Sequence, residues 1–201
     1  MKEGVFVHDT AEVSDRANLG RNSKIWNLVQ IRDGVEIGKN CILSKNVYID
    51  FDVKVGNNVK IQNNVSVYNG VTIEDDVFVG PCVVFTNDLM PRAVVNEWNI
   101  TETLIKKGAS LGANCTIVCG NIVGEYAVVA AGSVVTKSVS PNTLVLGNPA
   151  KAVAFVYNSG RKVEISDIKE VTLETVIFKA PSDKELLALP VSALRLLPSK
   201  I

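Results

Sequence analysis

The sequence predicts an all-β protein, a parallel β-helix of six-residue repeats with one loop that leaves the coil and a small C-terminal cap. Three periodic observations predict this fold: an aliphatic residue at every sixth position, a small or β-branched residue two positions earlier, and a turn-forming residue three positions later. The aliphatic series runs almost without exception through Val7, Val13, Leu19, Ile25, Ile31, Ile37, Leu43, Ile49, Val55, Ile61, Val67, Ile73, Val79 and Phe85.

Each repeat supplies two inward residues separated by one outward residue. This spacing is the period of a short strand and not of a helix. The earlier inward residues are Ala11, Ala17, Ser23, Val29, Val35, Cys41, Val47, Val53, Val59, Val65, Val71, Val77 and Val83. The turn positions often carry residues that tolerate a positive φ, and these are Asn22, Gly34, Asn40, Asn46, Asp52, Asn58, Asn64, Gly70, Asp76 and Asp88.

Three strands and three corners make one triangular coil of eighteen residues. Successive coils are expected to stack at the inter-strand spacing of roughly 4.8 Å, with valine and isoleucine filling the interior.

The period is interrupted once. After Phe85 the next aliphatic residue in phase is Ile105, so about fourteen extra residues leave the coil, and we expect an excursion loop over 88–103. The loop carries residues that have no place in a coil: Pro91, Arg92, Glu97, Trp98 and Glu102. Long loops on rigid scaffolds commonly carry function, and a tolerated surface insertion is the alternative.

The hexads stop after Pro141, and the chain is expected to divide into a β-helix domain (1–153) and a C-terminal extension (154–201). Alternating residues predict strands at Val163–Ile165 and Val171–Leu173 in the extension. Glu185–Leu197 is expected to form a short helix interrupted by Pro190.

Composition excludes several classes of function. In 201 residues, 21 basic and 21 acidic side chains leave no net charge to attract nucleic acid or an anionic membrane. Neither an apolar N-terminal signal segment nor an apolar run of membrane-spanning length is present. The four cysteines, Cys41, Cys82, Cys115 and Cys119, follow no secreted framework. We therefore expect a soluble, cytoplasmic protein with reduced thiols.

The period, the excursion and the ending Gly147–Lys151 together resemble the hexapeptide-repeat acyltransferases over about residues 5–153. The segments Lys60–Tyr68, Glu74–Pro81 and Phe85–Ala93 are similar to those of the nucleotide-sugar 3-N-acetyltransferases. The resemblance implies a left-handed coil, the donor acetyl-CoA, a homotrimer with active sites between adjacent prisms, and a nucleotide-linked 3-amino sugar as acceptor. Such sugars serve surface polysaccharide (lipopolysaccharide O-antigen) biosynthesis.

The histidine content of the chain bears on this resemblance, since many hexapeptide acyltransferases use a histidine base. This chain has one histidine, His8, which lies more than four coils from Phe85. The 3-N-acetyltransferases resemble this chain in placing an asparagine at the site, and Asn87 matches that position. Eighteen-residue stacking places Asn87 above Asn69 and Thr86 above Tyr68, so the four should form one corner patch beneath the loop. Phe85 and Asp88 flank this patch and are further candidates for substrate binding. Plain turn roles for the two asparagines are the alternative.

The resemblance also implies binding residues for both substrates. Gly112, Ala130, Ala131 and Gly132 would contact the pantetheine arm of CoA, Lys137 and Lys151 its phosphates, and Pro149 its adenine. Arg92, Gln62 and Asn63 are candidates for the diphosphate and hydroxyls of the acceptor. No metal site is expected: Cys115 and Cys119 lack further ligands, and one histidine cannot supply the three of β-helical carbonic anhydrases.

Two alternatives stay open at this point: a non-catalytic β-helical scaffold, and an acetyltransferase of another small acceptor. Serine and xenobiotic acetyltransferases are disfavoured by the missing histidine. Asp88–Arg92 is more similar to the enzymes that act on dTDP-3-amino-3,6-dideoxyhexoses than to those that act on UDP-3-amino-glucuronates.

Overall fold

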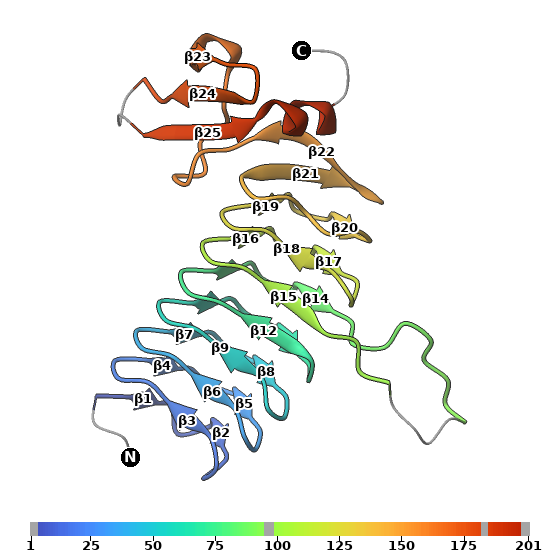
Figure 1. Cartoon of the computed structure of the whole chain (residues 1–201). Coiled ribbons are helices and arrows are strands. Elements are labelled where there is room, and N and C mark those ends of the chain that lie inside the picture. Colours follow the sequence, from blue (N-terminus) through green and yellow to red (C-terminus); the bar gives the residue numbers. More distant parts are fainter. Residues whose placement is uncertain (1–3, 95–98, 182–184, 198–201) are drawn as a thin grey trace.

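The computed structural model describes residues 4–94, 99–181 and 185–197. It forms a left-handed parallel β-helix, a triangular prism whose first coil lies at the N-terminal end and whose last coil lies under the cap (Figure 1). Three parallel sheets make the sides of the prism, and we call them faces A, B and C in the order in which the chain meets them.

Face A ends in the only long strands of the prism among the described residues. Its members are β1 (Phe6–Val7), β4 (Lys24–Ile25), β7 (Ile42–Leu43), β10 (Lys60–Ile61), β13 (Phe78–Val79), β16 (Ser110–Leu111), β19 (Val128–Val129), β21 (Thr143–Gly147) and β22 (Ala150–Phe155). The last two strands pair antiparallel as a hairpin, and all earlier pairs are parallel.

Faces B and C consist of parallel strands alone. Face B contains β2 (Glu12–Val13), β5 (Gln30–Ile31), β8 (Tyr48–Ile49), β11 (Ser66–Val67), β14 (Val84–Phe85), β17 (Thr116–Ile117) and β20 (Val134–Val135). Face C contains β3 (Asn18–Leu19), β6 (Glu36–Ile37), β9 (Lys54–Val55), β12 (Val71–Ile73), β15 (Thr103–Ile105) and β18 (Ile122–Val123).

The interior of the prism is the predicted stack of aliphatic side chains. Ile25, Leu43, Ile61 and Leu111 on face A are all 0% exposed, and the corresponding residues of the other faces pack against them. Outward residues of the same strands are half-buried or exposed, as period-two alternation requires. This core fixes the height and direction of every corner residue.

The corners confirm most of the predicted turn positions. Nine of the ten predicted residues have positive φ; Asp88 does not, because the chain leaves the coil at that point without completing the turn. Leu28, Cys82 and Tyr126 also have positive φ, although none of these residue types favours it. The winding of the coil therefore imposes the conformation, and sequence preference follows it only in part.

The excursion leaves the corner between faces B and C, after β14, and returns at β15 (Figure 1). Thr103 was predicted as the last loop residue, but it begins β15 and pairs with Val71. Thr101 N–H donates to the Asn87 carbonyl oxygen over 2.8 Å, which ties the end of the loop to the corner beneath it. Glu97 and Trp98 lie outside the described residues.

The C-terminal extension differs from the prediction in its elements. It contains η1 (Ile165–Asp167), a sheet of β23 (Ile168–Val171), β24 (Thr175–Lys179) and β25 (Leu186–Pro190), and η2 (Val191–Leu196), in which both η elements are 3₁₀ helices. The predicted strand Val163–Ile165 is wrong, and of Val171–Leu173 only Val171 lies in a strand. The helix predicted from Glu185 is a strand up to Pro190, because Leu187 and Leu189 alternate inward in period two onto the cap core.

The division of the chain at residue 153 stays a prediction, and β22 runs across it. None of the helices in the described ranges has the length and apolarity needed to span a membrane.

Candidate functional site

The corner between faces B and C beneath the excursion brings together the predicted patch, and we call Tyr68, Asn69, Thr86 and Asn87 the corner patch. The Asn87 amide Nδ2 donates to the Asn69 carbonyl oxygen over 3.4 Å, so the two asparagines stack as the eighteen-residue arithmetic predicts. Asn87 is 8% exposed, and its carbonyl oxygen accepts the hydrogen bond from Thr101 at the end of the excursion. Its amide is thus held in place and shielded from most solvent.

The side chains beside Asn87 are also fixed by the neighbouring coils. Cys119 N–H donates to the Thr86 hydroxyl oxygen over 3.0 Å from the coil above. Asp88, at the start of the excursion, accepts a 2.7 Å hydrogen bond from the Met90 N–H. It is half-buried, so its carboxylate stands beside the patch as the nearest acidic group along the chain.

The coil below supplies a group that the sequence analysis missed, the buried carboxylate of Asp50. Its Oδ2 accepts from the Asn69 N–H over 3.2 Å, and its Oδ1 accepts from the Tyr48 hydroxyl over 2.8 Å and from the Phe51 N–H over 2.9 Å. The Tyr48 and Tyr68 rings lie 6.1 Å apart. Burial, followed by the hydrogen bond to Asp50, raises the pKa of Tyr48 to about 12.

A signal for this carboxylate was present in the sequence. Asp50 stands eighteen residues before Tyr68, and Phe51 stands eighteen residues before Asn69. Extending the stacking arithmetic by one more coil would have added both residues to the patch. Arg32, a further eighteen residues before Asp50, continues the same column.

Four of the predicted acceptor-binding residues do not reach the patch in this chain. Phe85 is 1% exposed and packs in the prism core, so its ring cannot contact a substrate. Arg92 is exposed on the excursion, where its Nη1 donates to the Pro91 carbonyl oxygen over 2.8 Å. Gln62 and Asn63 follow β10 on face A and therefore lie at the A–B corner, one side of the prism away.

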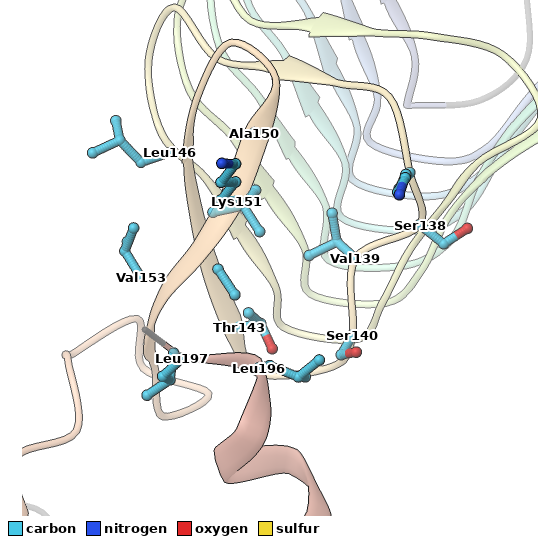
Figure 2. Close-up of a pocket in the computed structure, with 13 residues that line it drawn as sticks. Ser138, Val139, Ser140, Thr143, Leu146, Ala150, Lys151, Val153, Leu196 and Leu197 are labelled. Atoms are coloured by element: carbon cyan, nitrogen blue, oxygen red, sulfur yellow. The ribbon is translucent and has the colours of Figure 1, made fainter. Parts of the chain in front are cut away.

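The predicted donor residues fall into two groups. Lys137 lies on the same corner as Asn87. Phe85 pairs with Ile117, and Ile117 pairs with Val135, so the three residues are stacked on face B. Asn87 comes two positions after Phe85, and Lys137 comes two positions after Val135. The separation of Asn87 and Lys137 is two coils, roughly 10 Å at the inter-strand spacing. Lys137 and Lys151 line one cavity of about 610 Å³ under the cap (Figure 2).

The cap contributes to this cavity as well. Leu196 and Leu197, from the C-terminal end of the described chain, lie across it from Lys151 (Figure 2). Neither lysine forms an ion pair with a carboxylate in the parts of the chain that the structure describes. The cavity is therefore cationic and partly apolar.

The small residues predicted for the pantetheine arm lie at the A–B corner instead. A Cβ on Gly112 would stand 2.5 Å from the Ala131 nitrogen, so these two coils pack directly backbone on backbone. Gly132 has φ +70° and no atom within 4 Å of the Cβ position, which leaves open space beside it. Pro149 lies in the exposed turn of the β21–β22 hairpin, after a cis peptide bond.

The arrangement favours chemistry by oriented hydrogen bonds rather than by a histidine base. His8 follows β1, four strands of face A below the coil of Asn87, which is roughly 19 Å. An asparagine amide cannot take up a proton at neutral pH, but its N–H groups can bind a developing oxyanion or orient a nucleophile. Among the described residues, no group of three or more metal-ligating side chains is gathered in one place.

Comparison with known families places these features in context. The sequence model of the bacterial transferase hexapeptide family (six repeats) matches residues 16–50 and 52–87, and that of the hexapeptide repeat of succinyl-transferase matches residues 105–137. The chain is 47% identical over 169 residues to the dTDP-3-amino-3,6-dideoxy-α-D-galactopyranose 3-N-acetyltransferase of Aneurinibacillus thermoaerophilus, covering 84% of this chain and 88% of the relative.

Two solved structures share the coil. A hexapeptide-repeat acetyltransferase of Vibrio cholerae, determined with acetyl-CoA, is 28% identical with a TM-score of 0.54 over 61% of this chain and 71% of its own. A galactoside acetyltransferase in complex with coenzyme A is 24% identical with a TM-score of 0.55, over 63% and 66% of the two chains, and shows the fold alone.

Proposed function

Because the chain belongs to the hexapeptide-repeat nucleotide-sugar acetyltransferases, we propose that it moves the acetyl group of acetyl-CoA to the 3-amino group of a nucleotide-linked amino sugar. The observation that carries this proposal is the 47% identity that extends over 88% of a dTDP-3-amino-3,6-dideoxygalactose 3-N-acetyltransferase. It favours a dTDP-3-amino-3,6-dideoxyhexose over a UDP-3-amino-glucuronate. The scaffold alternative is not favoured, because the relatives are acetyltransferases.

The corner patch supports direct transfer without a protein base. Asn87 orients the neutral amine or binds the oxyanion that develops on the acetyl carbonyl. The amine forms the new N–C bond as the C–S bond of the thioester breaks, and proximity in the shielded corner supplies most of the rate. The amine proton passes to water, to Asp88 or to the departing CoA sulfur.

The donor end of the site is proposed from charge and position. Lys137 lies above Asn87 on the same corner, and Lys151 faces the same cavity, so the two ammonium groups suit the phosphates of CoA. Gly112, Ala130, Ala131 and Gly132 suit the pantetheine arm but lie at the other end of face B. A neighbouring copy would have to bring its A–B corner to this B–C corner, so the proposed enzyme is a homotrimer.

The cellular setting follows from the proposed reaction. A nucleotide-linked amino sugar and acetyl-CoA are small soluble substrates, and the proposal places the protein in the cytoplasm. An N-acetylated nucleotide sugar is an activated monosaccharide, so the proposed product serves surface polysaccharide (O-antigen) biosynthesis.

The proposal is tested by following CoA thiol release from acetyl-CoA with a panel of UDP- and dTDP-linked 3-amino sugars. We expect turnover with a dTDP-3-amino-3,6-dideoxyhexose, one thiol per amide formed, and a product heavier by one acetyl group in mass spectrometry. The matched control is the same nucleotide sugar with a 3-hydroxyl group, which should not react. If the protein bound neither acetyl-CoA nor any of the amino sugars, the proposal would be wrong.

A further inference from the structure

A cavity of about 550 Å³ lies on face B below the corner patch, outside the residues that the sequence analysis assigned. It is lined by Ala11, Glu12, Val13, Ser14, Gln30, Ile31, Arg32, Asp33 and Phe51. Phe51 is directly below Asn69, and Arg32 is one coil below Asp50, so the cavity begins where the corner patch ends. It extends away from Asn87 in the direction opposite to the lysine cavity under the cap.

Arg32 and Phe51 form a paired cationic and aromatic surface in this cavity. The Arg32 Cζ lies 4.6 Å from the centroid of the Phe51 ring, a cation–π distance that holds both side chains in place. Phe51 is 39% exposed, which leaves part of the ring accessible to a ligand. Its N–H is held by Asp50, which also holds the backbone of Asn69.

Arg32 is the basic side chain that lines the cavity, and the two carboxylates that line it, Glu12 and Asp33, are bonded to other side chains. Gln30 Nε2 donates to the Glu12 carboxylate over 2.8 Å. Asp33 accepts from the Ser14 hydroxyl and pairs with Arg16 at 3.5 Å. No carboxylate of the described chain forms an ion pair with Arg32, so its guanidinium has donors to offer to an anion.

The distances along the coil match the size of a nucleotide sugar. Phe51 lies two coils below Asn87, roughly 10 Å, and Arg32 lies three coils below Thr86, roughly 14 Å. A hexose with its amine at Asn87 would span the first coil or two, and its diphosphate and base would then reach these side chains.

We infer that Arg32 and Phe51 form the subsite for the nucleoside diphosphate of the acceptor, with the Arg32 guanidinium on the diphosphate and the Phe51 ring against the base. This inference rests on the proposed function, because it assumes an acceptor that carries a nucleotide. It replaces Arg92, whose guanidinium is bonded to its own loop, as the diphosphate-binding cation.

The test uses dTDP alone as the binding probe, by isothermal titration calorimetry on the full chain. Loss of a charged hydrogen-bond donor predicts that Arg32→Ala weakens dTDP binding about tenfold or more. Loss of stacking predicts about fivefold or more for Phe51→Leu. Arg32→Lys should recover only part of the loss, because an ammonium cannot bind the diphosphate bidentately.

Arg21→Ala is the matched control, since Arg21 is an exposed guanidinium that neither lines the cavity nor pairs with its carboxylates. It should leave dTDP binding unchanged. In the thiol-release assay, Arg32→Ala should raise the KM for the amino sugar, while the KM for acetyl-CoA and kcat at saturating acceptor stay within twofold or so of wild type. A general disruption of the coil would instead change all three parameters, the two KM values and kcat.

Separate outcomes overturn the inference and the proposed function. Wild-type turnover with unchanged dTDP binding in Arg32→Ala and Phe51→Leu removes this subsite and leaves the enzyme assignment intact. Wild-type protein that fails to bind dTDP also removes the subsite. Wild-type protein that binds dTDP with the expected variant effects but acetylates no amino sugar keeps the subsite and contradicts the proposed function.

Discussion

At the scale of single residues, the corner patch is built from hydrogen bonds that fix backbone and amide together. Asn87 is bonded to Asn69, and Asn69 is bonded through its N–H to the buried carboxylate of Asp50. A displacement of the Asp50 carboxylate would therefore be transmitted to Asn87 through Asn69. In the proposed reaction this chain of contacts preorganises the amide before the substrates bind.

The role of Asn87 is tested against that of His8. Asn87→Ala should lower kcat by the loss of one preorganised hydrogen bond, about 2.7 to 4 kcal/mol at most, so some activity should remain. His8→Ala should leave kcat nearly unchanged, because His8 lies four coils away. The kcat at saturating acetyl-CoA should rise with pH as a single ionisation, that of the amine. An inactive His8→Ala protein with intact circular dichroism and oligomeric state would refute the histidine-free mechanism.

Asp50 is expected to act as a positioning residue for the corner patch. Asp50→Asn should lower kcat/KM about tenfold, as expected from weakening a hydrogen bond to a charged acceptor. The same substitution should bring the pKa of Tyr48 down from about 12, because it removes the carboxylate while burial remains. Titration of tyrosinate absorbance, with Tyr48→Phe to identify the signal, measures this shift. An unchanged titration would show that Asp50 does not control Tyr48.

Tyr48 also makes stability depend on pH in a defined window. Its pKa is higher in the folded chain, about 12, than the ordinary 10.0, so the folded state retains the proton that the unfolded state loses. The resulting stabilisation is complete below pH 10.0 and is lost as pH rises toward 12. Urea unfolding across this range should show a smaller loss for Tyr48→Phe than for wild type.

At the scale of elements, the excursion is held at its base by the corner from which it leaves. Thr103 N–H donates to the Gly70 carbonyl oxygen over 2.9 Å, and a Cβ on Gly70 would lie 2.5 Å from the Ile100 Cγ2. Gly70 has φ +92°. Glycine is thus required here both by the backbone and by the close approach of the loop.

Gly70→Ala should therefore displace the loop as well as strain the backbone. Both this variant and the control Gly160→Ala carry the cost of a positive φ, about 1–2 kcal/mol, but a Cβ at Gly160 meets no atom within 4 Å. Urea unfolding should show the larger loss for Gly70→Ala, together with a raised KM for the amino sugar. The difference should shrink when Ile100 is also replaced by alanine. Equal effects of the two glycine substitutions would exclude the proposed contact.

At the scale of the whole molecule, the prism exposes apolar side chains on each of its sides. Phe78 is 40% exposed on face A, Val84 49% on face B and Ile122 43% on face C. Closed cyclic symmetry would bury equivalent patches of this kind. The exposed apolar side chains therefore agree with the proposed trimer.

Light scattering should therefore give a mass three times the 21.7 kDa of one chain. Val84→Glu should weaken the assembly, because a carboxylate would be buried without a partner, while the solvent-exposed Leu173→Glu in the cap should not. A stable wild-type monomer at micromolar concentration would be incompatible with a site shared between copies.

The sequence by itself determined the coil, the place of the excursion and the stacking of Asn87 on Asn69. The reason is that nearly every hexad obeys the same local rule, so inward side chains and eighteen-residue neighbours can be counted along the chain. The cap could not be predicted in this way, since Leu187 and Leu189 face inward only because of the sheet that receives them.

Only the tertiary structure decided which polar residues meet at the site. It joined Asp50 to Asn69, placed Lys137 and Lys151 on one cavity, and left Arg92 on its own loop while Arg32 faced a groove. Contacts of this kind depend on the direction of each side chain and on which carboxylates are already paired. The spacing of residues along the sequence gives neither the side-chain directions nor the pairing.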